Sequence, residues 1–262
     1  NVLDEVESKI IESRLEEEGV RLHYHTELES VLGKHGKVDA VLTGAGEKIP
    51  CGLVAFAIGI RPRLELAKAA GLQIDRGILV DEFLATSAPD VFAAGDVAQV
   101  YDPFSGRSIL DSLWNPARMQ GDTAGLNMAG LQTPYHKGVP FNVTRLAGLT
   151  TTIIGTVGGG KDEDLMGIAR GDSETWRKFP DAIAAQDNFD VNRVRVMVGE
   201  TSLRGAIVMG DQKLSKPIHH LIADEADIRP IRDRLLEPAA PIADLISDFF
   251  LSWKWGHAAP QP

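Results

Sequence analysis

Apolar and charged residues alternate at the start of the chain with the spacing of a helix. The apolar positions recur every three or four residues: Leu3, Val6, Ile10, Ile11 and Leu15. Residues at this spacing share one face of an α-helix, and Gly19 stands where such a helix commonly ends. The pattern predicts an amphipathic helix over residues 3–19 that packs against another part of the molecule.

Three strand-like runs follow, separated by glycine-containing turns. They span residues 20–26, 37–43 and 52–60. The third run, GLVAFAIGI, is apolar on both faces, which is typical of a central strand that is covered on both sides. Residues 61–75 then predict a helix that ends at Gly71, and residues 77–87 predict an extended pair.

The segment WNPARMQGDTAGLNMAG, residues 114–130, predicts a helix with well-marked ends. Asn115 is a good N-cap, Pro116 suits the first helical position, and Gly130 is a natural stop.

After Pro134 the pattern changes to β-strands with tight turns and then to helices. The strand-like segments are 138–160, 192–200 and 203–211, and two short helices split at Pro230 are predicted within 213–236. Residues 242–256 predict an apolar, aromatic helix inside a Pro/Ala-rich tail. We therefore expect a second, α+β domain that begins near residue 134.

Length, net charge and cysteine content limit the classes of function that this sequence can have. A chain of 262 residues has room for about two domains, and its formal net charge of −10 argues against nucleic acid and favours a basic or iron-containing protein partner. Cys51 is the single cysteine, which excludes an internal disulfide, a thiolate metal cluster and a redox-active cysteine pair within this sequence. Every apolar run is shorter than the ~20 residues of a membrane span. We expect a soluble, cytoplasmic protein.

Two further motifs favour structural interpretations. The run GTVGGG, Gly155 to Gly160, has Val157 where a dinucleotide-binding loop needs its second glycine, and an acidic segment follows, so a flexible hairpin turn is favoured. His219 and His220 are adjacent, so on a helix their side chains point about 100° apart and favour a surface or partly buried pair over a metal site.

The stretch TSAPDVFAAGDVAQV, residues 86–100, places Gly-Asp directly after a short apolar run. One interpretation is an ordinary turn at the end of a strand. The other is a ligand-binding turn, in which Gly95 lets a ligand approach the backbone and Asp96 accepts a hydrogen bond from a hydroxyl group. The turn alone leaves both interpretations open.

Two segments in fixed order, AFAIGIRPR and ATSAPDVFAAGDVAQ, resemble the flavin-dependent pyridine nucleotide oxidoreductases. The similarity is to the branch that contains rubredoxin and ferredoxin reductases and the flavin module of nitrite reductase large subunits. It extends from about Leu3 to Leu236 and includes the helix after the Gly-Asp turn and the segments RLAGLTTTIIGTVG and LRGAIVMGD.

The resemblance implies a set of cofactor-binding residues. Asp96 would face inward and accept a hydrogen bond from a ribityl hydroxyl of FAD, while Gly95 and the amide of Val97 approach the pyrophosphate. The helix that begins at Asn115–Pro116, near Trp114, would direct its positive end at the flavin. Ile58 and Gly59 would lie on the nicotinamide side. The resemblance implies no side-chain catalyst in this chain, because hydride passes directly between the two rings.

The resemblance also implies an incomplete nucleotide site, since neither Gly-x-Gly-x-x-Gly fingerprint of the family is present. We expect an α/β fold made of remnants of NAD(P)H- and FAD-binding domains (residues 1–60 and 61–133), a small α+β domain (134–236) and a tail (237–262). About 170 preceding residues would be missing. The expected function is an FAD-dependent NAD(P)H oxidoreductase that passes electrons to a protein or small molecule. The alternative is a non-catalytic subunit that docks a partner or oligomerises through its aromatic tail.

Overall fold

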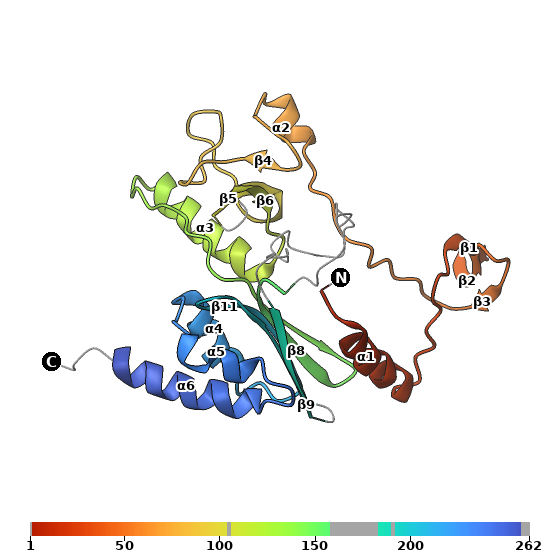
Figure 1. Cartoon of the computed structure of the whole chain (residues 1–262). Helices are drawn as coiled ribbons and strands as arrows, with labels where there is room; N and C mark the ends of the chain where they lie inside the picture. Colours follow the sequence, from red (N-terminus) through yellow and green to blue (C-terminus); the bar gives the residue numbers. More distant parts are fainter. Residues whose placement is uncertain (1, 104–105, 158–182, 190–191, 258–262) are drawn as a thin grey trace.

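The computed structural model describes residues 2–103, 106–157, 183–189 and 192–257. Its largest sheet has five antiparallel strands in the order β7-β8-β11-β10-β9 (Figure 1). The strands are β7 (Phe141–Leu146), β8 (Leu149–Gly155), β9 (Ile183–Phe189), β10 (Asn192–Val198) and β11 (Leu203–Met209). This sheet confirms the β-segments predicted after Pro134, while β9 was not predicted.

Three helices cover one face of this sheet. They are α4 (Ser215–Ala223), α5 (Arg229–Leu235) and α6 (Ile242–His257). Val194, Val196 and Val198 of β10 point to this side and join Ile218 and Ile246 in the core of the domain. The aromatic tail helix therefore packs on its own domain. Pro230 lies in the first turn of α5, so the break between α4 and α5 comes earlier than the sequence predicted.

The opposite face of the sheet is covered by α1 (Glu5–Glu17), which lies far from it in sequence (Figure 1). Leu3, Ile10 and Ile11 pack against Met197 of β10 and Ile207 of β11. This packing confirms the amphipathic helix predicted at the start of the chain. Since both faces of β10 are covered, all its residues from Arg193 to Val198 are buried.

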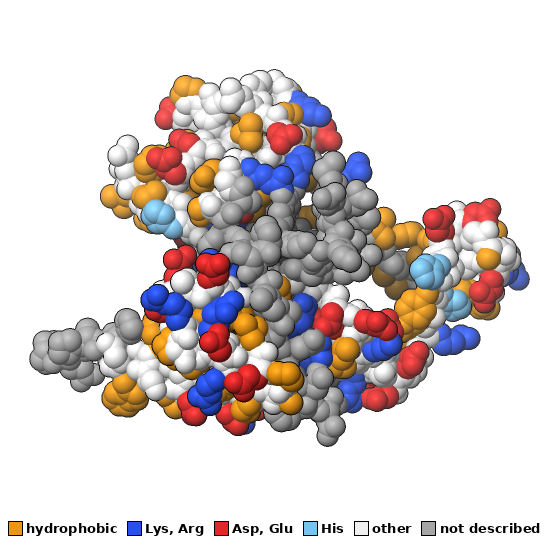
Figure 2. All heavy atoms as spheres, viewed as in Figure 1, with side chains coloured by type: hydrophobic (Ala, Val, Ile, Leu, Met, Phe, Trp, Pro, Cys, Tyr) orange, Lys and Arg blue, Asp and Glu red, His pale blue; other side chains and the backbone are white. Residues whose placement is uncertain are grey.

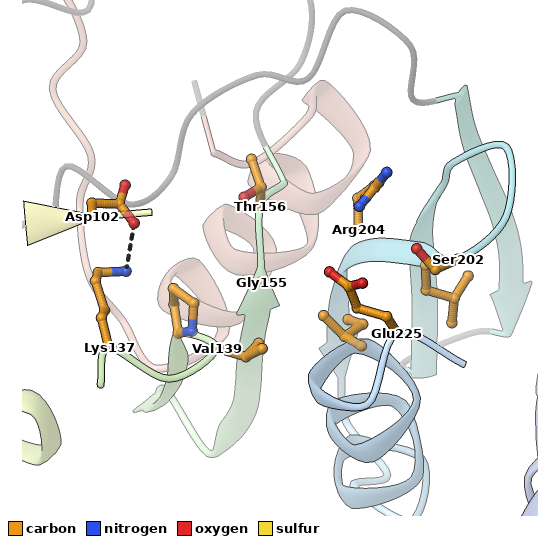
Figure 3. A pocket seen from close by; sticks show the side chains of 11 residues that line it. Asp102, Lys137, Val139, Gly155, Thr156, Ser202, Arg204 and Glu225 are labelled. Atoms are coloured by element: carbon orange, nitrogen blue, oxygen red, sulfur yellow. Dashed lines mark ion pairs between the residues drawn. The ribbon is translucent and has the colours of Figure 1, made fainter. Parts of the chain in front are cut away.

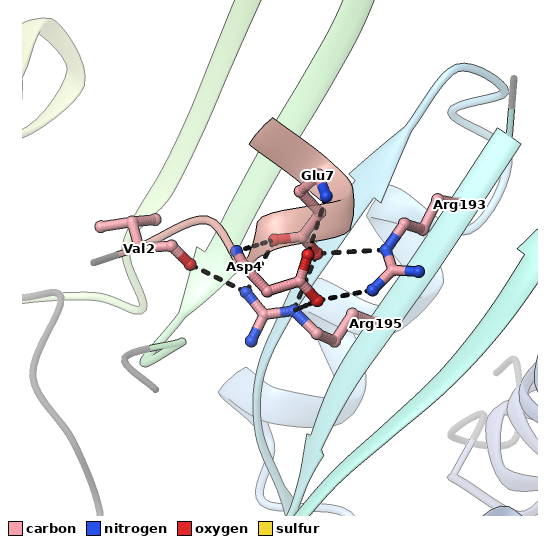
Figure 4. A network of polar contacts seen from close by, with 5 residues as sticks. All are labelled: Val2, Asp4, Glu7, Arg193 and Arg195. Atoms are coloured by element: carbon pink, nitrogen blue, oxygen red, sulfur yellow. Dashed lines mark hydrogen bonds and ion pairs between the residues drawn. The ribbon is translucent and has the colours of Figure 1, made fainter. Parts of the chain in front are cut away.

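A buried charge cluster fastens α1 to the sheet (Figure 4). Asp4 and Glu7 form a capping box at the start of α1, and the same two carboxylates accept hydrogen bonds from arginines on β10. Arg193 and Arg195 are two residues apart on a strand, so they point to the same face. Arg195 binds both carboxylate oxygens of Glu7, at 2.7 and 2.9 Å, and also donates to the carbonyl oxygen of Val2.

A small antiparallel meander follows α1. It contains β1 (Leu28–Lys34), β2 (Lys37–Thr43) and β3 (Lys48–Pro50), in that order across the sheet. The prediction of a strand at 37–43 is confirmed, and the prediction at 20–26 is wrong. Residues 20–26 include a turn at 24–25, and β1 begins only after them.

The prediction of a central strand at 52–60 is also wrong. These residues form an irregular connector without a strand between β3 and α2 (Glu65–Ala69) (Figure 1). Its apolar side chains are exposed, including Leu53, Phe56, Ile58 and Ile60, with exposures of 54 to 77%. A strand needs a neighbour that completes its hydrogen bonds, and the sheets of the described ranges supply none for this segment.

Residues 65–133 form a compact unit around a third sheet. Its strands are β4 (Ile78–Leu79), β5 (Ala98–Asp102) and β6 (Arg107–Leu110), and β4 pairs in parallel with β5. The helix α3 (Trp114–Met128) packs on this sheet through the buried side of Ala124. The N-cap of α3 is Leu113, so the prediction that Asn115 caps the helix is wrong by two residues. Within the described ranges, none of the helices is both long enough and apolar enough to cross a bilayer.

Candidate functional site

The Gly-Asp motif forms a tight turn between an extended segment and β5. Ala94 is extended, and Gly95, Asp96 and Val97 make one 3-10 turn. Gly95 has a φ of +78°, a conformation that glycine adopts at little cost and other residues rarely adopt. The glycine of the motif is therefore required by the backbone itself.

The turn is held from two sides. On one side, the backbone N–H of Gly95 donates a 2.7 Å hydrogen bond to Oε1 of Gln120, a fully buried residue of α3. On the other side, Gly77 lies so close that an added Cβ would come within 2.7 Å of the carbonyl oxygen of Val97. Both contacts come from sequence-distant residues, and they fix the turn against the start of β5 and the first half of α3.

The side chain of Asp96 is exposed, so the inward orientation expected from the sequence is not what the structure has. The reason lies in the turn: the backbone of Gly95 faces α3, and the next residue projects outward. No hydrogen bond or ion pair involves this carboxylate among the described residues. The carboxylate is thus accessible to a hydroxyl group of a ligand on the surface.

The N-terminus of α3 lies beside the turn, and α3 contacts the Gly95–Val97 segment. Leu113, the N-cap residue, has no side-chain oxygen with which to cap the helix. The first backbone N–H groups of α3 therefore add positive potential at this end. Trp114 is 81% exposed, Asn115 is exposed and Pro116 is partly buried.

Ile58 and Gly59 are the two predicted residues that the structure does not bring to the turn. They lie on the connector, where Ile58 is 75% exposed and Gly59 has a φ of +93° (Figure 1). Figure 2 shows hydrophobic side chains at the surface where this connector runs toward the β1–β3 meander.

A cavity lies elsewhere, between the end of β5 and the adjoining ends of β8 and β11 (Figure 3). Its wall includes Asp102, Lys137, Thr156, Ser202 and Arg204. Lys137 is almost completely buried, and its Nζ lies 3.5 Å from Asp102 and 3.9 Å from Asp111. Sequence reasoning missed this group, because no local spacing joins residues so far apart along the chain.

The remaining sequence candidates take structural positions. His219 meets the ring of Phe141 edge-on, and His220 stacks on Phe250 of α6, so the two histidines contact aromatic rings on different elements. Gly155 ends β8, while residues 158–160 of the glycine run lie outside the described part of the chain.

Comparisons with known proteins show what this chain is similar to. Residues 1–121 match a family model described as pyridine nucleotide-disulphide oxidoreductase. The chain is 34% identical over 148 residues to an NADH oxidase of Methanocaldococcus jannaschii, covering 56% of the chain and 33% of that protein. It is 35% identical over 163 residues to the ferredoxin–NAD(+) reductase component of a biphenyl dioxygenase system of Paraburkholderia xenovorans, covering 62% and 38%.

Among solved structures, a ferredoxin reductase from Rhodopseudomonas palustris superposes with a TM-score of 0.72 at 20% identity, covering 92% of this chain and 55% of that one. This likeness confirms the expected fold class. The chain spans about a third of the length of both curated relatives.

Proposed function

We propose, from the match of residues 1–121 to the family model described as pyridine nucleotide-disulphide oxidoreductase, that the chain forms part of an FAD-dependent NAD(P)H oxidoreductase. The observation that carries the proposal is the Gly95–Val97 turn, with its left-handed glycine, its accessible Asp96 carboxylate and its attachment to α3. FAD, when bound, supplies a ring that takes a hydride from NAD(P)H and passes electrons onward one or two at a time.

The residues of this chain fit the ribityl and flavin portions of FAD. Asp96 accepts a hydrogen bond from a ribityl hydroxyl, and the Val97 amide faces the pyrophosphate. The start of α3, at Trp114, Asn115 and Pro116, directs partial positive charge at the flavin ring, where reduction adds negative charge. Each of these roles is supported by the position of the residue on the turn or on the adjoining helix end.

The nicotinamide side of the proposed site includes Ile58 and Gly59. Their connector exposes several large apolar side chains, and such a contiguous segment is usually covered by protein. We propose that further polypeptide, in the same protein or in another subunit, pairs with residues 52–60 and completes the NAD(P)H site. The apolar pattern of residues 52–60, typical of a central strand, supports this.

The proposed electron acceptor is a small iron-containing protein or a small molecule. Support comes from the printed names of relatives, which include ferredoxin–NAD(+) and rubredoxin–NAD(+) reductases. The alternative, a non-catalytic subunit that docks or oligomerises through α6, is supported less. Phe249, Phe250 and Trp253 pack on their own domain, which leaves Leu251 and Trp255 as the exposed large apolar residues of the described helix.

The test is to purify the natural protein that carries this sequence and to record its visible spectrum before and after NADH or NADPH is added without oxygen. The proposal predicts flavin absorption that one of the two nucleotides bleaches. A colourless protein that binds no added FAD would contradict it.

A further inference from the structure

Gln120 is a fully buried amide side chain on a helix face whose other buried residue is Ala124. A buried polar group is costly unless it is hydrogen-bonded. Its Oε1 accepts from the backbone N–H of Gly95, 25 residues earlier in sequence, at 2.7 Å. In the part of the chain that the structure describes, no hydrogen bond of ordinary geometry reaches its Nε2. The contact with Gly95 is therefore what holds this side chain in place.

The other buried glutamine of the same unit shows the contrast. Gln99 accepts from the backbone N–H of Gly77, and its amide nitrogen donates to both Asp75 and the carbonyl oxygen of Ser108. The printed hydrogen bonds of Gln99 therefore join several elements of the fold, whereas the Oε1 of Gln120 accepts from one turn. That turn is the one that presents Asp96.

We propose that Gln120 is the positioning residue of the Gly95–Val97 turn. Through the Gly95 amide it sets the direction in which the Asp96 carboxylate and the Val97 amide meet the cofactor. This inference rests on the proposed FAD site and assigns to it a residue that does not itself touch the ligand. Replacing Gln120 by an apolar residue leaves the Gly95 N–H without its acceptor. The turn then shifts so that this N–H can reach another acceptor or water, and Asp96 and Val97 shift with it.

A second contact links the same amide to the entrance of the C-terminal domain. Tyr135 is partly buried beside Gln120; burial, the larger effect, raises the pKa of its hydroxyl, and the neighbouring Gln120 amide opposes that shift. The backbone N–H of Tyr135 bonds to the carbonyl oxygen of Glu82 at 2.6 Å. Gln120 thus lies between the turn and the segment that leads into the other domain.

The test is a double-mutant cycle on FAD affinity in the natural protein, with Gln120→Leu, Asp96→Ala and the two combined. Gln120→Leu is expected to weaken FAD binding about tenfold, the loss that one hydrogen bond accounts for. If Gln120 acts through Asp96, Asp96→Ala should weaken FAD binding by a much smaller factor in the Gln120→Leu variant than in the wild type. Gln120→Glu keeps an acceptor and should bind FAD close to wild type.

Asn127→Leu is the matched control. It removes a partly buried amide from the same helix, but the Asn127 amide donates to the carbonyl oxygens of Phe83 and Thr133 at the far end of α3. This variant should lower stability and leave FAD affinity unchanged.

The outcomes distinguish failure of the proposed FAD site from failure of the role proposed for Gln120. A wild-type protein that binds no FAD contradicts the proposed function. A wild type that binds FAD, with additive effects in the cycle or with equal losses in Gln120→Leu and Asn127→Leu, overturns the role of Gln120 alone. If Gln120→Leu does not fold, Gln120→Met replaces it in the cycle. If neither variant folds while Asn127→Leu does, Gln120 serves the stability of the whole fold, and the inference is overturned.

Discussion

The Glu7 carboxylate and the Arg195 guanidinium form a buried 2.7 Å ion pair between residues 188 positions apart in the chain. Glu7 belongs to the first helix, inside the region that matches the oxidoreductase family, and Arg195 belongs to the C-terminal sheet beyond it. The pair therefore holds α1 against β10 of the five-stranded sheet. With Arg193, which is also buried, and Asp4, which is partly exposed, it balances two negative and two positive charges between α1 and β10.

Glu7→Gln should destabilise the attachment of α1 strongly. It leaves two buried arginines facing one carboxylate, and breaking a buried pair typically costs about 3–5 kcal/mol. The expected results are a lower denaturation midpoint and faster hydrogen exchange of the α1 amides. Glu5→Gln is the control, because Glu5 pairs with Lys9 on the exposed side of the same helix, where water and salt screen the pair and it contributes little to stability. Equal effects of the two variants would contradict the role of the buried cluster.

Acid should weaken the same attachment. Burial by itself raises the pKa of Asp4, but the Glu7 amide and the Arg193 guanidinium together hold that pKa below its ordinary value of 3.8. A carboxylate with a lowered pKa in the folded state contributes stability above its unfolded pKa, and this is lost as pH falls through the folded value. Stability measured by denaturant titration should therefore drop below about pH 4. Asp4→Asn should reduce that slope; an unchanged slope would rule out this contribution.

Gly95→Ala should destabilise the protein through the backbone alone. An added Cβ would lie 3.6 Å from the Cβ of Ala117, an ordinary contact, so there is space for it. The φ of +78° is the obstacle, and it costs a residue with a Cβ roughly 1–2 kcal/mol. Gly95→Asn should cost less, since asparagine tolerates this conformation. Thermal melting of both variants decides the matter: a neutral Gly95→Ala would mean that the turn does not require a left-handed residue.

Local patterns predicted the elements whose partners lie within the chain. The helix with apolar face Leu3 to Leu15 is present, because the sheet it packs on is present. The alternation in NRVRVMV predicted a strand, and β10 has its valines toward α4–α6 and its arginines toward α1. Which element covers each face is known only from the fold. The connector at 52–60 has the composition of a central strand but lacks neighbouring strands in the described sheets, so its local preference is not realised.

Long-range contacts at the candidate site could not be predicted from the sequence. The Gly-Asp motif indicated a turn at Gly95, but its attachment to Gln120 joins residues with no common local pattern. The cap of α3 also depends on context: Asn115 has the preferred chemistry, yet the chain enters the helix at Leu113. The buried ion group of Lys137, Asp102 and Asp111 joins the segment before β7 to β5 and to the residue after β6, which no local spacing indicates.

The most direct test of the account is the dissociation constant for FAD of the natural protein and of its Asp96→Ala variant, measured by titration. A hydrogen bond to a charged acceptor contributes about 1.5–3 kcal/mol, so Asp96→Ala should weaken binding about tenfold to a hundredfold. Asp122→Ala, a surface change on α3 that removes a carboxylate paired with Arg118, should leave the constant unchanged. Equal affinity for FAD in the wild type and in Asp96→Ala would contradict the assignment of the Gly95–Val97 turn as the flavin site.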